Sequence, residues 1–319
     1  MKNLKITALA LVVLLASCEK KELVSGIYKK NMDTLVKPGD DFDSYVNGSW
    51  FKNTKIPADK ASYGAFDMLY DKSLKDVKTI IEEASKGSNA DGSDEQKIGD
   101  YYASFMNRKD RDSKGIKPIE SDLKSIDAIA NYNDLAAYFG KANKAGLAIP
   151  FQISVYTDFK NPNEYILITW QGGLGLPERE YYLSTDAKMA DIRKKYVAHV
   201  DKMYQLVGLP NSAENASKIM ALETAMATYH MKKEDTRDTQ KLYNKYATQD
   251  LKTLMSDFDW SAMLKNASVD KEKNIVVTQV EYIKNLNNLI KTTPIDTWKT
   301  YLKWSLINSS ASSLTTTLD

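Results

Sequence analysis

Hydrophobic side chains recur at steps of three and four positions along most of the chain, which is the spacing of one face of an α-helix. The segment from Asp67 to Ser85 follows this pattern and is followed by Gly87, a residue type that commonly ends helices. The segment from Met189 to Val207 shows the same steps and stops at Gly208-Leu-Pro210. The pattern therefore predicts a mainly α-helical protein.

Capping residues indicate where further helices should begin, because their side chains accept hydrogen bonds from the free N–H groups of a first turn. The first of these helices should end at Asn47-Gly48. The expected starts are Asp40 or Asp41, Ser93 in a Ser-Asp-Glu-Gln capping box, Pro118 at a first helical position, Asn133, Ser212, Thr248 and Thr293-Pro294.

Two short segments have the composition of β-strands. Phe151 to Tyr156 and Tyr165 to Trp170 flank Asn161-Pro-Asn163, which predicts a β-hairpin at about 151–170. Ile275 to Val277 could form a lone strand. No repeat of about 34 residues is evident, which argues against a tetratricopeptide-type solenoid. The expected fold class is mainly α, with many helices and one small hairpin.

The segment from Trp170 to Leu183, here called the glycine-rich loop, joins the hairpin to a long helix. Three glycines within four positions and then Pro177 allow the backbone to turn and to approach another surface closely. The Gly-Lys-Ser/Thr ending of a phosphate-binding loop is missing from this segment. The loop is therefore not expected to hold phosphate.

The charge balance argues against nucleic acid as a partner. The chain has 44 Lys and Arg and 42 Asp and Glu, for a formal net charge of +2. These charges are interspersed, whereas binding to a phosphate backbone requires clustered positive charge.

The first residues have the pattern of a secretory signal peptide. Lys2 and Lys5 precede the apolar core from Ile6 to Leu15, which is too short to span a bilayer, since a spanning helix needs about 20 apolar residues. The ending Leu-Ala-Ser-Cys18 resembles a bacterial lipobox, in which the cysteine is lipidated and becomes the mature N-terminus. The alternative is an ordinary signal peptide that happens to contain a cysteine.

The lipobox resemblance predicts residues 1–17 as signal peptide and residues 18–37 as a polar tether. It implies a lipid-anchored protein of the bacterial cell envelope, and Glu19 after the cysteine favours the outer membrane. Cys18 is the only cysteine, so no disulfide can form within the chain.

Residue types alone predict no catalytic or metal site. The two histidines, His199 and His230, do not form a His-Glu-x-x-His motif, and we interpret both as ordinary helix histidines. No Gly-x-Ser-x-Gly elbow occurs. Asp40, Asp41 and Asp43 could in principle bind a metal ion, but capping explains them better because calcium-loop spacing is missing.

Two longer segments resemble one enzyme family, the neprilysin-like zinc metallopeptidases, which include the endothelin-converting enzymes. One is Pro-Gly-Asp-Asp-Phe-Asp-Ser-Tyr-Val-Asn-Gly-Ser-Trp within 38–51, and the other is Gly-Leu-Pro-Glu-Arg-Glu-Tyr-Tyr-Leu within 173–183. Segments 56–71, 234–244 and 298–304 continue the resemblance in the expected order. In the 234–244 segment we expect an ion-pair network that closes a helical corner.

The resemblance implies a two-lobed, zinc-dependent oligopeptidase that encloses peptide substrates. The first part of such proteins forms a helical lobe that caps the cavity, and the later part carries the zinc motif, the downstream glutamate ligand and the proton-handling histidine. None of these motifs is present here. Residues 38–319 are therefore expected to form the capping lobe, truncated before the catalytic domain and inactive alone. The expected cofactor is none in this chain and zinc in the missing region.

One residue of substrate recognition could still lie in this part. In the type member of the family, the segment matching Ser62 to Asp71 supplies two arginines and an aspartate that contact the carboxyl-terminal side of the substrate. Here only Asp67 keeps its type, since the arginine positions correspond to Ser62 and Tyr70. Asp67 is thus the candidate substrate-binding residue, although it is equally suited to cap a helix. Without the arginine clamp, we expect no preference for releasing carboxyl-terminal dipeptides.

Two alternatives remain open on the sequence. The chain could be a stand-alone helical surface lipoprotein that binds a ligand such as glycan through exposed aromatics, since it has 19 tyrosines and five tryptophans. It could also be a pseudo-enzyme that serves as an interaction module.

Overall fold

The computed structural model describes residues 26–58, 60 and 62–319. The predicted signal peptide and Cys18 lie outside the described residues. The described residues divide into two compact units, one up to residue 91 and the other from residue 92 to residue 319, and each is described by itself. Among the described residues, no helix is both long enough and apolar enough to cross a membrane.

The described residues of the first unit form a short 3₁₀ helix, η1 (Lys29–Asn31), and two α-helices, α2 (Phe42–Asn53) and α3 (Ala65–Lys86). Asp41 caps α2, as predicted, by accepting a hydrogen bond from the Ser44 backbone N–H at 2.9 Å. The prediction that this helix ends at Asn47-Gly48 is wrong. Gly48 is a buried point of close approach rather than a terminator, because a Cβ there would lie 2.8 Å from Cβ of Asp33.

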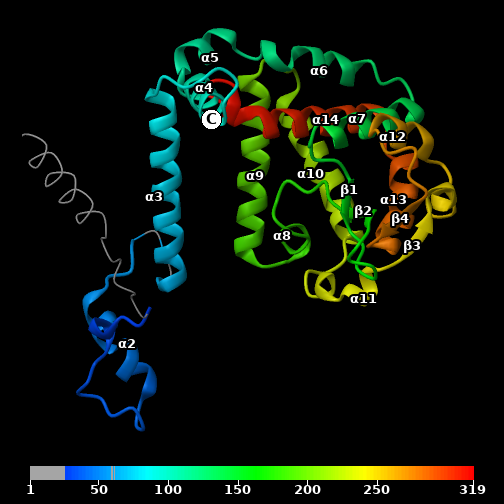
Figure 1. Cartoon of the computed structure of the whole chain (residues 1–319). Coiled ribbons are helices and arrows are strands. Elements are labelled where there is room, and N and C mark those ends of the chain that lie inside the picture. The colour runs from blue at the N-terminus through cyan, green and yellow to red at the C-terminus, as the bar shows by residue number, and fades with distance from the viewer. Residues whose placement is uncertain (1–25, 59, 61) are drawn as a thin grey trace, which may run out of the picture. The chain divides into compact units, whose positions relative to one another are not determined.

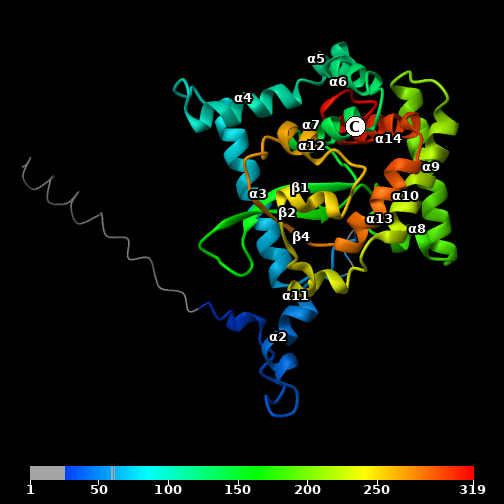
Figure 2. The ribbon, with the colours of Figure 1, turned by 90° about the vertical axis from the view of Figure 1, so that its right-hand side faces the viewer.

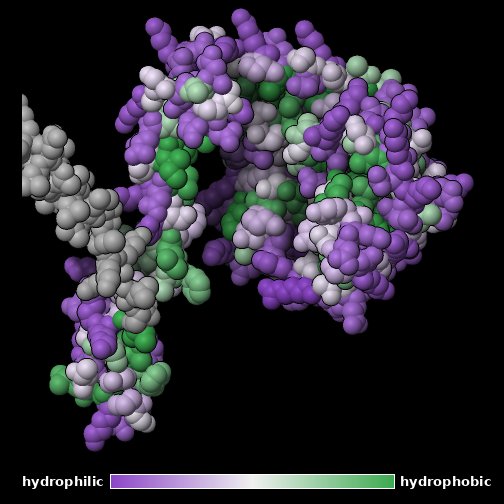
Figure 3. All heavy atoms as spheres, viewed as in Figure 1, coloured by the Kyte–Doolittle hydropathy of each residue, from purple (hydrophilic) through white to green (hydrophobic). Residues whose placement is uncertain are grey.

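Helix α3 matches the predicted segment and ends at Gly87, whose N–H donates to the Glu83 carbonyl. One side of this helix exposes a row of large hydrophobic side chains, and Figure 3 shows hydrophobic residues along it. The exposed members are Phe66, Leu69, Tyr70, Leu74, Val77 and Ile80.

The second unit is mainly helical, which confirms the predicted fold class (Figure 1). Its α-helices are α4 (Asp94–Met106), α5 (Arg108–Lys114), α6 (Lys117–Asp127), α7 (Tyr132–Lys144), α8 (Glu180–Leu183), α9 (Ala187–Leu206), α10 (Ser212–Tyr229), α11 (Thr239–Leu242), α12 (Trp260–Asn266), α13 (Val280–Thr292) and α14 (Ile295–Ser310). Three 3₁₀ helices accompany them: η2 (Asp235–Arg237), η3 (Thr248–Thr253) and η4 (Ala311–Ser313).

Two of the predicted helix caps are wrong. Asn131, not Asn133, caps α7 by accepting hydrogen bonds from the N–H groups of Asn133 and Asp134. Thr248 begins a 3₁₀ helix without capping it, because its hydroxyl donates instead to the Glu272 carbonyl at 2.8 Å.

The sheet of the second unit has four strands in the order β1-β2-β4-β3, and Figure 2 shows β1, β2 and β4 side by side. Strands β1 (Phe151–Thr157) and β2 (Tyr165–Gln171) form the predicted antiparallel hairpin. The expectation of a lone strand at Ile275 to Val277 is wrong, because strand β4 (Asn274–Val277) lies inside the sheet. It pairs in parallel with β2 and antiparallel with β3 (Lys245–Ala247).

Helix α14 lies at the centre of the core. Its side chains Trp298, Tyr301 and Leu302 are almost fully buried, and the helix packs against α6, α9 and α10. Tyr301 also reaches the glycine-rich loop, where its hydroxyl donates to the Gly173 carbonyl at 3.0 Å. The core thereby fixes the position of the loop.

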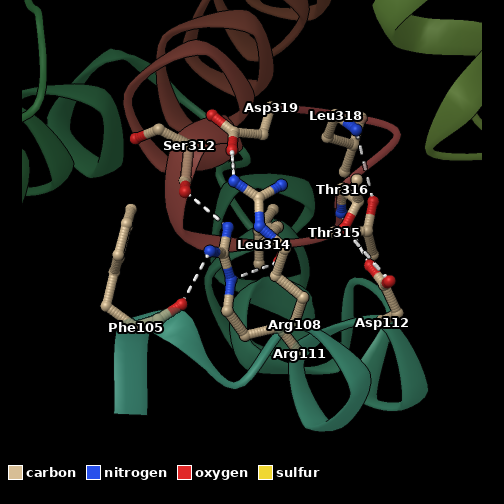
Figure 4. A network of polar contacts seen from close by, with 10 residues as sticks. All are labelled: Phe105, Arg108, Arg111, Asp112, Ser312, Leu314, Thr315, Thr316, Leu318 and Asp319. Carbon is tan, nitrogen blue, oxygen red and sulfur yellow. Dashed lines mark hydrogen bonds and ion pairs between the residues drawn. The ribbon is translucent and has the colours of Figure 1, made fainter. Parts of the chain in front are cut away.

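The end of the described chain is tied to α5 by a polar network (Figure 4). The buried Arg111 guanidinium donates to the carbonyls of Phe105, Ser312 and Leu314 at 3.0, 2.5 and 2.9 Å. The neighbouring Asp112 accepts a hydrogen bond from the Thr316 N–H at 2.6 Å. Residues about 200 positions apart in sequence are therefore joined by the Arg111 guanidinium and the Asp112 carboxylate together.

Candidate functional site

The glycine-rich loop follows β2 and packs tightly on the helices beneath it. A Cβ at Gly175 would lie 1.9 Å from the hydroxyl oxygen of Tyr196. Gly173 has a φ of +86°, and a Cβ there would lie 2.8 Å from the hydroxyl oxygen of Tyr301. Only glycine fits such contacts without displacement of the neighbouring atoms. The expectation that these glycines allow close approach to another surface is confirmed.

A buried carboxylate holds this loop in place. Glu223 of α10 is 1% exposed and accepts two hydrogen bonds, from the hydroxyl of Tyr182 at 2.6 Å and from that of Tyr196 at 2.9 Å. Each hydroxyl in turn accepts one N–H: the backbone of Leu176 donates to Tyr182, and the Trp304 indole donates to Tyr196, both at 2.8 Å. The network therefore connects the loop with α8, α9, α10 and α14.

Burial raises the pKa of Glu223 despite its hydrogen bonds. Burial disfavours the charged form and raises the pKa to about 7, although the hydrogen bonds from Tyr182 and Tyr196 act in the opposite direction. Burial likewise raises the pKa of both tyrosines, and the nearby Glu223 carboxylate adds to the effect. Both hydroxyls therefore stay protonated and act as donors to the carboxylate at neutral pH.

The sequence analysis did not identify Glu223. A signal was present, because Glu223 follows Leu222 and stands one turn beyond Ile219 and three residues before Met226, on the face that the apolar residues define. A carboxylate on a core-facing stripe needs buried partners. The tyrosines that provide them lie 27 and 41 positions away, so the partnership itself was not visible in the sequence.

His230 holds the other side of the loop. It is the residue that ends α10, and its Nε2 lies 3.0 Å from the Gly172 carbonyl, so the neutral ring donates its Nε2–H there. The ring packs edge-on against Tyr282 with centroids 4.6 Å apart. Burial lowers the pKa of His230 to about 4, which keeps it uncharged. The interpretation of His230 as an ordinary helix histidine is therefore wrong, since it is a buried contact to the loop.

A pocket of about 290 Å³ lies between the loop and the segment after α10. Arg179, His230 and Lys233 line it together with the backbone of Gly172 and Gly173. The Arg179 side chain is only 20% exposed, and its Nε has no hydrogen-bond partner among the described residues. The pocket thus combines an enclosed cation with a second cation at Lys233, which is 66% exposed.

Asp67, the predicted substrate-binding residue, lies in the first turn of α3 in the first unit. Its Oδ2 accepts the Gly64 backbone N–H at 2.9 Å, so the side chain acts in helix capping. The Lys60 ammonium lies 3.9 Å from Asp67 and 3.0 Å from Asp71. The capping role is therefore present, and contact with a substrate stays a prediction.

The 234–244 segment closes a corner, as expected, but with few ion pairs. Lys241 pairs with Asp235 at 2.8 Å, and Asp238 caps α11 by accepting N–H groups of Gln240 and Lys241. The expected ion-pair network is thus reduced to one exposed pair, and hydrogen bonds from Asn244 to the carbonyls of Lys241 and Val277 also hold this turn.

The described residues do not fit a zinc ion. Over 26–58, 60 and 62–319, no three His, Cys, Asp or Glu side chains gather in a way that could hold a metal. His230 is hydrogen-bonded to Gly172 through Nε2, and His199 packs edge-on against Trp304 at 5.7 Å.

The chain is similar to proteins of a known family. The sequence pattern of the N-terminal part of Peptidase family M13 matches residues 38–319. The chain therefore belongs to Peptidase family M13, a family of zinc metallopeptidases, and the predicted resemblance is confirmed.

Particular relatives agree with this assignment. Endothelin-converting enzyme 1 of Rattus norvegicus is 27% identical over 303 residues, which cover 89% of this chain and 38% of the relative. Endothelin-converting enzyme-like 1 of Homo sapiens is 24% identical, with 87% and 38% covered. The chain thus spans about two fifths of the length of the curated relatives it matches.

Solved structures show the same fold. The zinc metalloprotease Zmp1 of Mycobacterium tuberculosis, in complex with an inhibitor, superposes with a TM-score of 0.80 at 34% identity, over 92% of this chain and 45% of that one. PepO from Lactobacillus rhamnosis HN001 superposes with a TM-score of 0.70 at 18% identity, which concerns the fold alone.

Proposed function

We propose that this chain is the substrate-enclosing lobe of a zinc-dependent oligopeptidase, and that it neither binds zinc tightly nor cuts peptides alone. The observation that carries the proposal is the family match over residues 38–319, which covers the N-terminal part of the family. The zinc ion and the groups that act on the peptide bond would then belong to residues outside this chain.

The exposed apolar face of α3 supports a role within a larger protein. Phe66 is 89% exposed, and Leu69 and Ile80 on the same helix are 63% and 57% exposed. Contiguous apolar surface of this kind commonly marks a site of contact with another protein surface. A catalytic region that covers this face would remove the apolar surface from water.

The substrates of the working enzyme would be peptides. A helical lobe that closes over a cavity admits flexible chains and excludes folded proteins, which is how the proposed lobe would select them. Asp67 is the residue of this lobe that we propose to contact the substrate, in addition to its contact with the Gly64 N–H.

We further propose that the chain is anchored to the bacterial envelope through a lipid on Cys18, with the outer membrane as its location. The support is the Leu-Ala-Ser-Cys sequence after a ten-residue apolar core. Replacing Cys18 (Cys18→Ser) should move the protein from the membrane fraction to the soluble fraction, and retention in the membrane fraction would contradict the lipid anchor.

The enzyme proposal is tested on the native protein. An antibody against this chain should deplete chelator-sensitive hydrolysis of short peptides from a membrane extract, and the captured species should be far heavier than 35.9 kDa. Capture of a 35.9 kDa species with full activity left in the extract would contradict the proposal.

A further inference from the structure

We infer that the pocket beside the glycine-rich loop binds the carboxylate of a peptide, with Arg179 as its main partner and Lys233 at its rim. The inference concerns binding by this chain itself and does not depend on peptide hydrolysis. It rests on the position, burial and incomplete pairing of these two cations.

Arg179 is an enclosed cation whose buried Nε has no hydrogen-bond partner among the described residues. Its side chain is 80% buried, its Nε is fully shielded, and no described residue accepts a hydrogen bond from it. The nearest carboxylate oxygen, on Glu180, lies 3.6 Å from Nε, which is an ion-pair distance but too long for a hydrogen bond. The Glu180 side chain is also 57% exposed, so water weakens this pairing.

A guanidinium has five N–H donors in a planar fork that matches a carboxylate. A mostly buried cation with an unpartnered donor is costly, and an anion that enters the pocket would offset part of this cost through the guanidinium charge. The fork also loses little side-chain entropy on binding, because the Arg179 side chain is already 80% buried.

The other walls of the pocket are compatible with an anion. His230 is neutral and is occupied by its hydrogen bond to Gly172, so it neither repels nor neutralises a ligand. Lys233 adds positive charge at the rim. Glu178 is the acidic side chain that also lines the pocket, and it lies 3.7 Å from the Lys233 ammonium. The charged side chains that line the pocket, Arg179, Lys233 and Glu178, sum to one positive charge, and Glu180 lies outside the lining at a more exposed position.

The loop sequence explains why the pocket is well formed. Pro177 and the glycines set the path of the backbone, and the Leu176 N–H is fixed to Tyr182, which is itself held by Glu223. Gln171 closes the base of the pocket by bonding the backbone N–H and C=O of Met231. The polar groups of Gln171 and Leu176 thereby bond to other groups of the protein, and the Arg179 guanidinium remains available to a ligand.

Calorimetric titration of the purified full chain tests the inference with matched peptides. The probes are a blocked, amidated peptide with one internal Glu, the same peptide with Gln, and a Gln peptide with a free carboxyl terminus. We expect the Glu peptide, the free-acid peptide or both to bind, and the blocked Gln peptide to bind at least tenfold more weakly. Comparison of the Glu peptide with the free-acid peptide distinguishes an acidic side chain from a chain terminus as the source of the carboxylate.

Variants then locate the binding. Arg179→Gln should weaken carboxylate binding about tenfold or more, since it removes a charge-assisted pair. Lys233→Gln, at an exposed rim position, should weaken it a few-fold and serves if Arg179→Gln fails to fold. Arg108→Gln, which changes an exposed arginine outside the pocket, should have no effect. Equal binding of the acidic and neutral peptides, no binding of either, or full affinity in both pocket variants would overturn the inference.

Discussion

The hydroxyl of Tyr196 lies 2.9 Å from Oε1 of Glu223, a carboxylate that is 1% exposed. This contact and its counterpart from Tyr182 place two neutral donors against one buried acid, and no cation forms an ion pair with this acid among the described residues. These hydrogen bonds hold the glycine-rich loop in place. The stability of the loop should therefore depend on the protonation of one side chain.

The first prediction concerns pH. The pKa of folded Glu223, about 7, lies above the ordinary value of 4.5. Between these values the folded protein holds a proton that the unfolded chain releases, so this contribution to stability is complete below pH 4.5 and is lost as the pH rises through 7. The loss amounts to roughly 3 kcal/mol at most. Denaturant unfolding at pH 5 and pH 8 measures it.

The Glu223→Gln variant should flatten this pH dependence, because the amide does not titrate. The slopes are compared rather than the absolute stabilities, since the amide nitrogen cannot accept a tyrosine hydrogen bond. Glu214→Gln, at an exposed ion pair with Lys218, is the matched control and should keep the wild-type slope. An unchanged slope in Glu223→Gln would refute the assignment of the buried proton to Glu223.

The second prediction concerns close packing of the loop. Gly175→Ala should lower the free energy of unfolding by about 1–3 kcal/mol, because its Cβ would overlap the Tyr196 hydroxyl, which is held by Glu223 and Trp304. Gly39→Ala is the control, since no atom lies within 4 Å of a Cβ there. Urea denaturation should separate the two variants, and equal midpoints would show that the loop can move aside.

The third prediction concerns the network of Figure 4. Arg111→Met keeps the apolar stem but removes three hydrogen bonds to the carbonyls of Phe105, Ser312 and Leu314. We expect a loss of about 2 kcal/mol or more and faster amide hydrogen exchange in residues 312–319. Arg108→Met removes only a half-exposed ion pair with Asp319 and should cost under about 1 kcal/mol. Unchanged exchange in Arg111→Met would contradict this account.

The fourth prediction separates the two roles of Asp67. Asp67→Ala removes the acceptor for the Gly64 N–H and should destabilise the start of α3 by about 1 kcal/mol, whereas Asp67→Asn keeps an acceptor oxygen and should cost less. If Asp67 also contacts substrate, Asp67→Asn should raise the KM of the working enzyme without changing stability. A wild-type KM in Asp67→Asn would leave only the capping role.

Local patterns in the sequence predicted local structure well. Hydrophobic spacing and turn residues act over a few positions. They predicted the hairpin of β1 and β2, helix α9 and helix α14. The pairing of Leu167 with Ile275 in parallel strands could not be predicted in this way. It brings together residues more than 100 positions apart, and the packing of the whole unit decides it.

The same distinction applies to the candidate site. The glycine-rich loop and its close approach were predicted because glycine has a local conformational meaning at these positions. Glu223 and His230 were missed because their roles depend on partners elsewhere in the chain, namely Tyr182 and Tyr196 for the acid and Gly172 for the imidazole. Burial of a polar side chain is a tertiary property.

The central claim is that this chain is the non-catalytic lobe of a zinc peptidase, and its most direct test is zinc analysis of the purified chain together with a peptide hydrolysis assay. The account predicts far less than one equivalent of zinc after dialysis and no chelator-sensitive hydrolysis. About one zinc per chain with chelator-sensitive cleavage of peptides would contradict it, since the chain would then contain a catalytic site of its own.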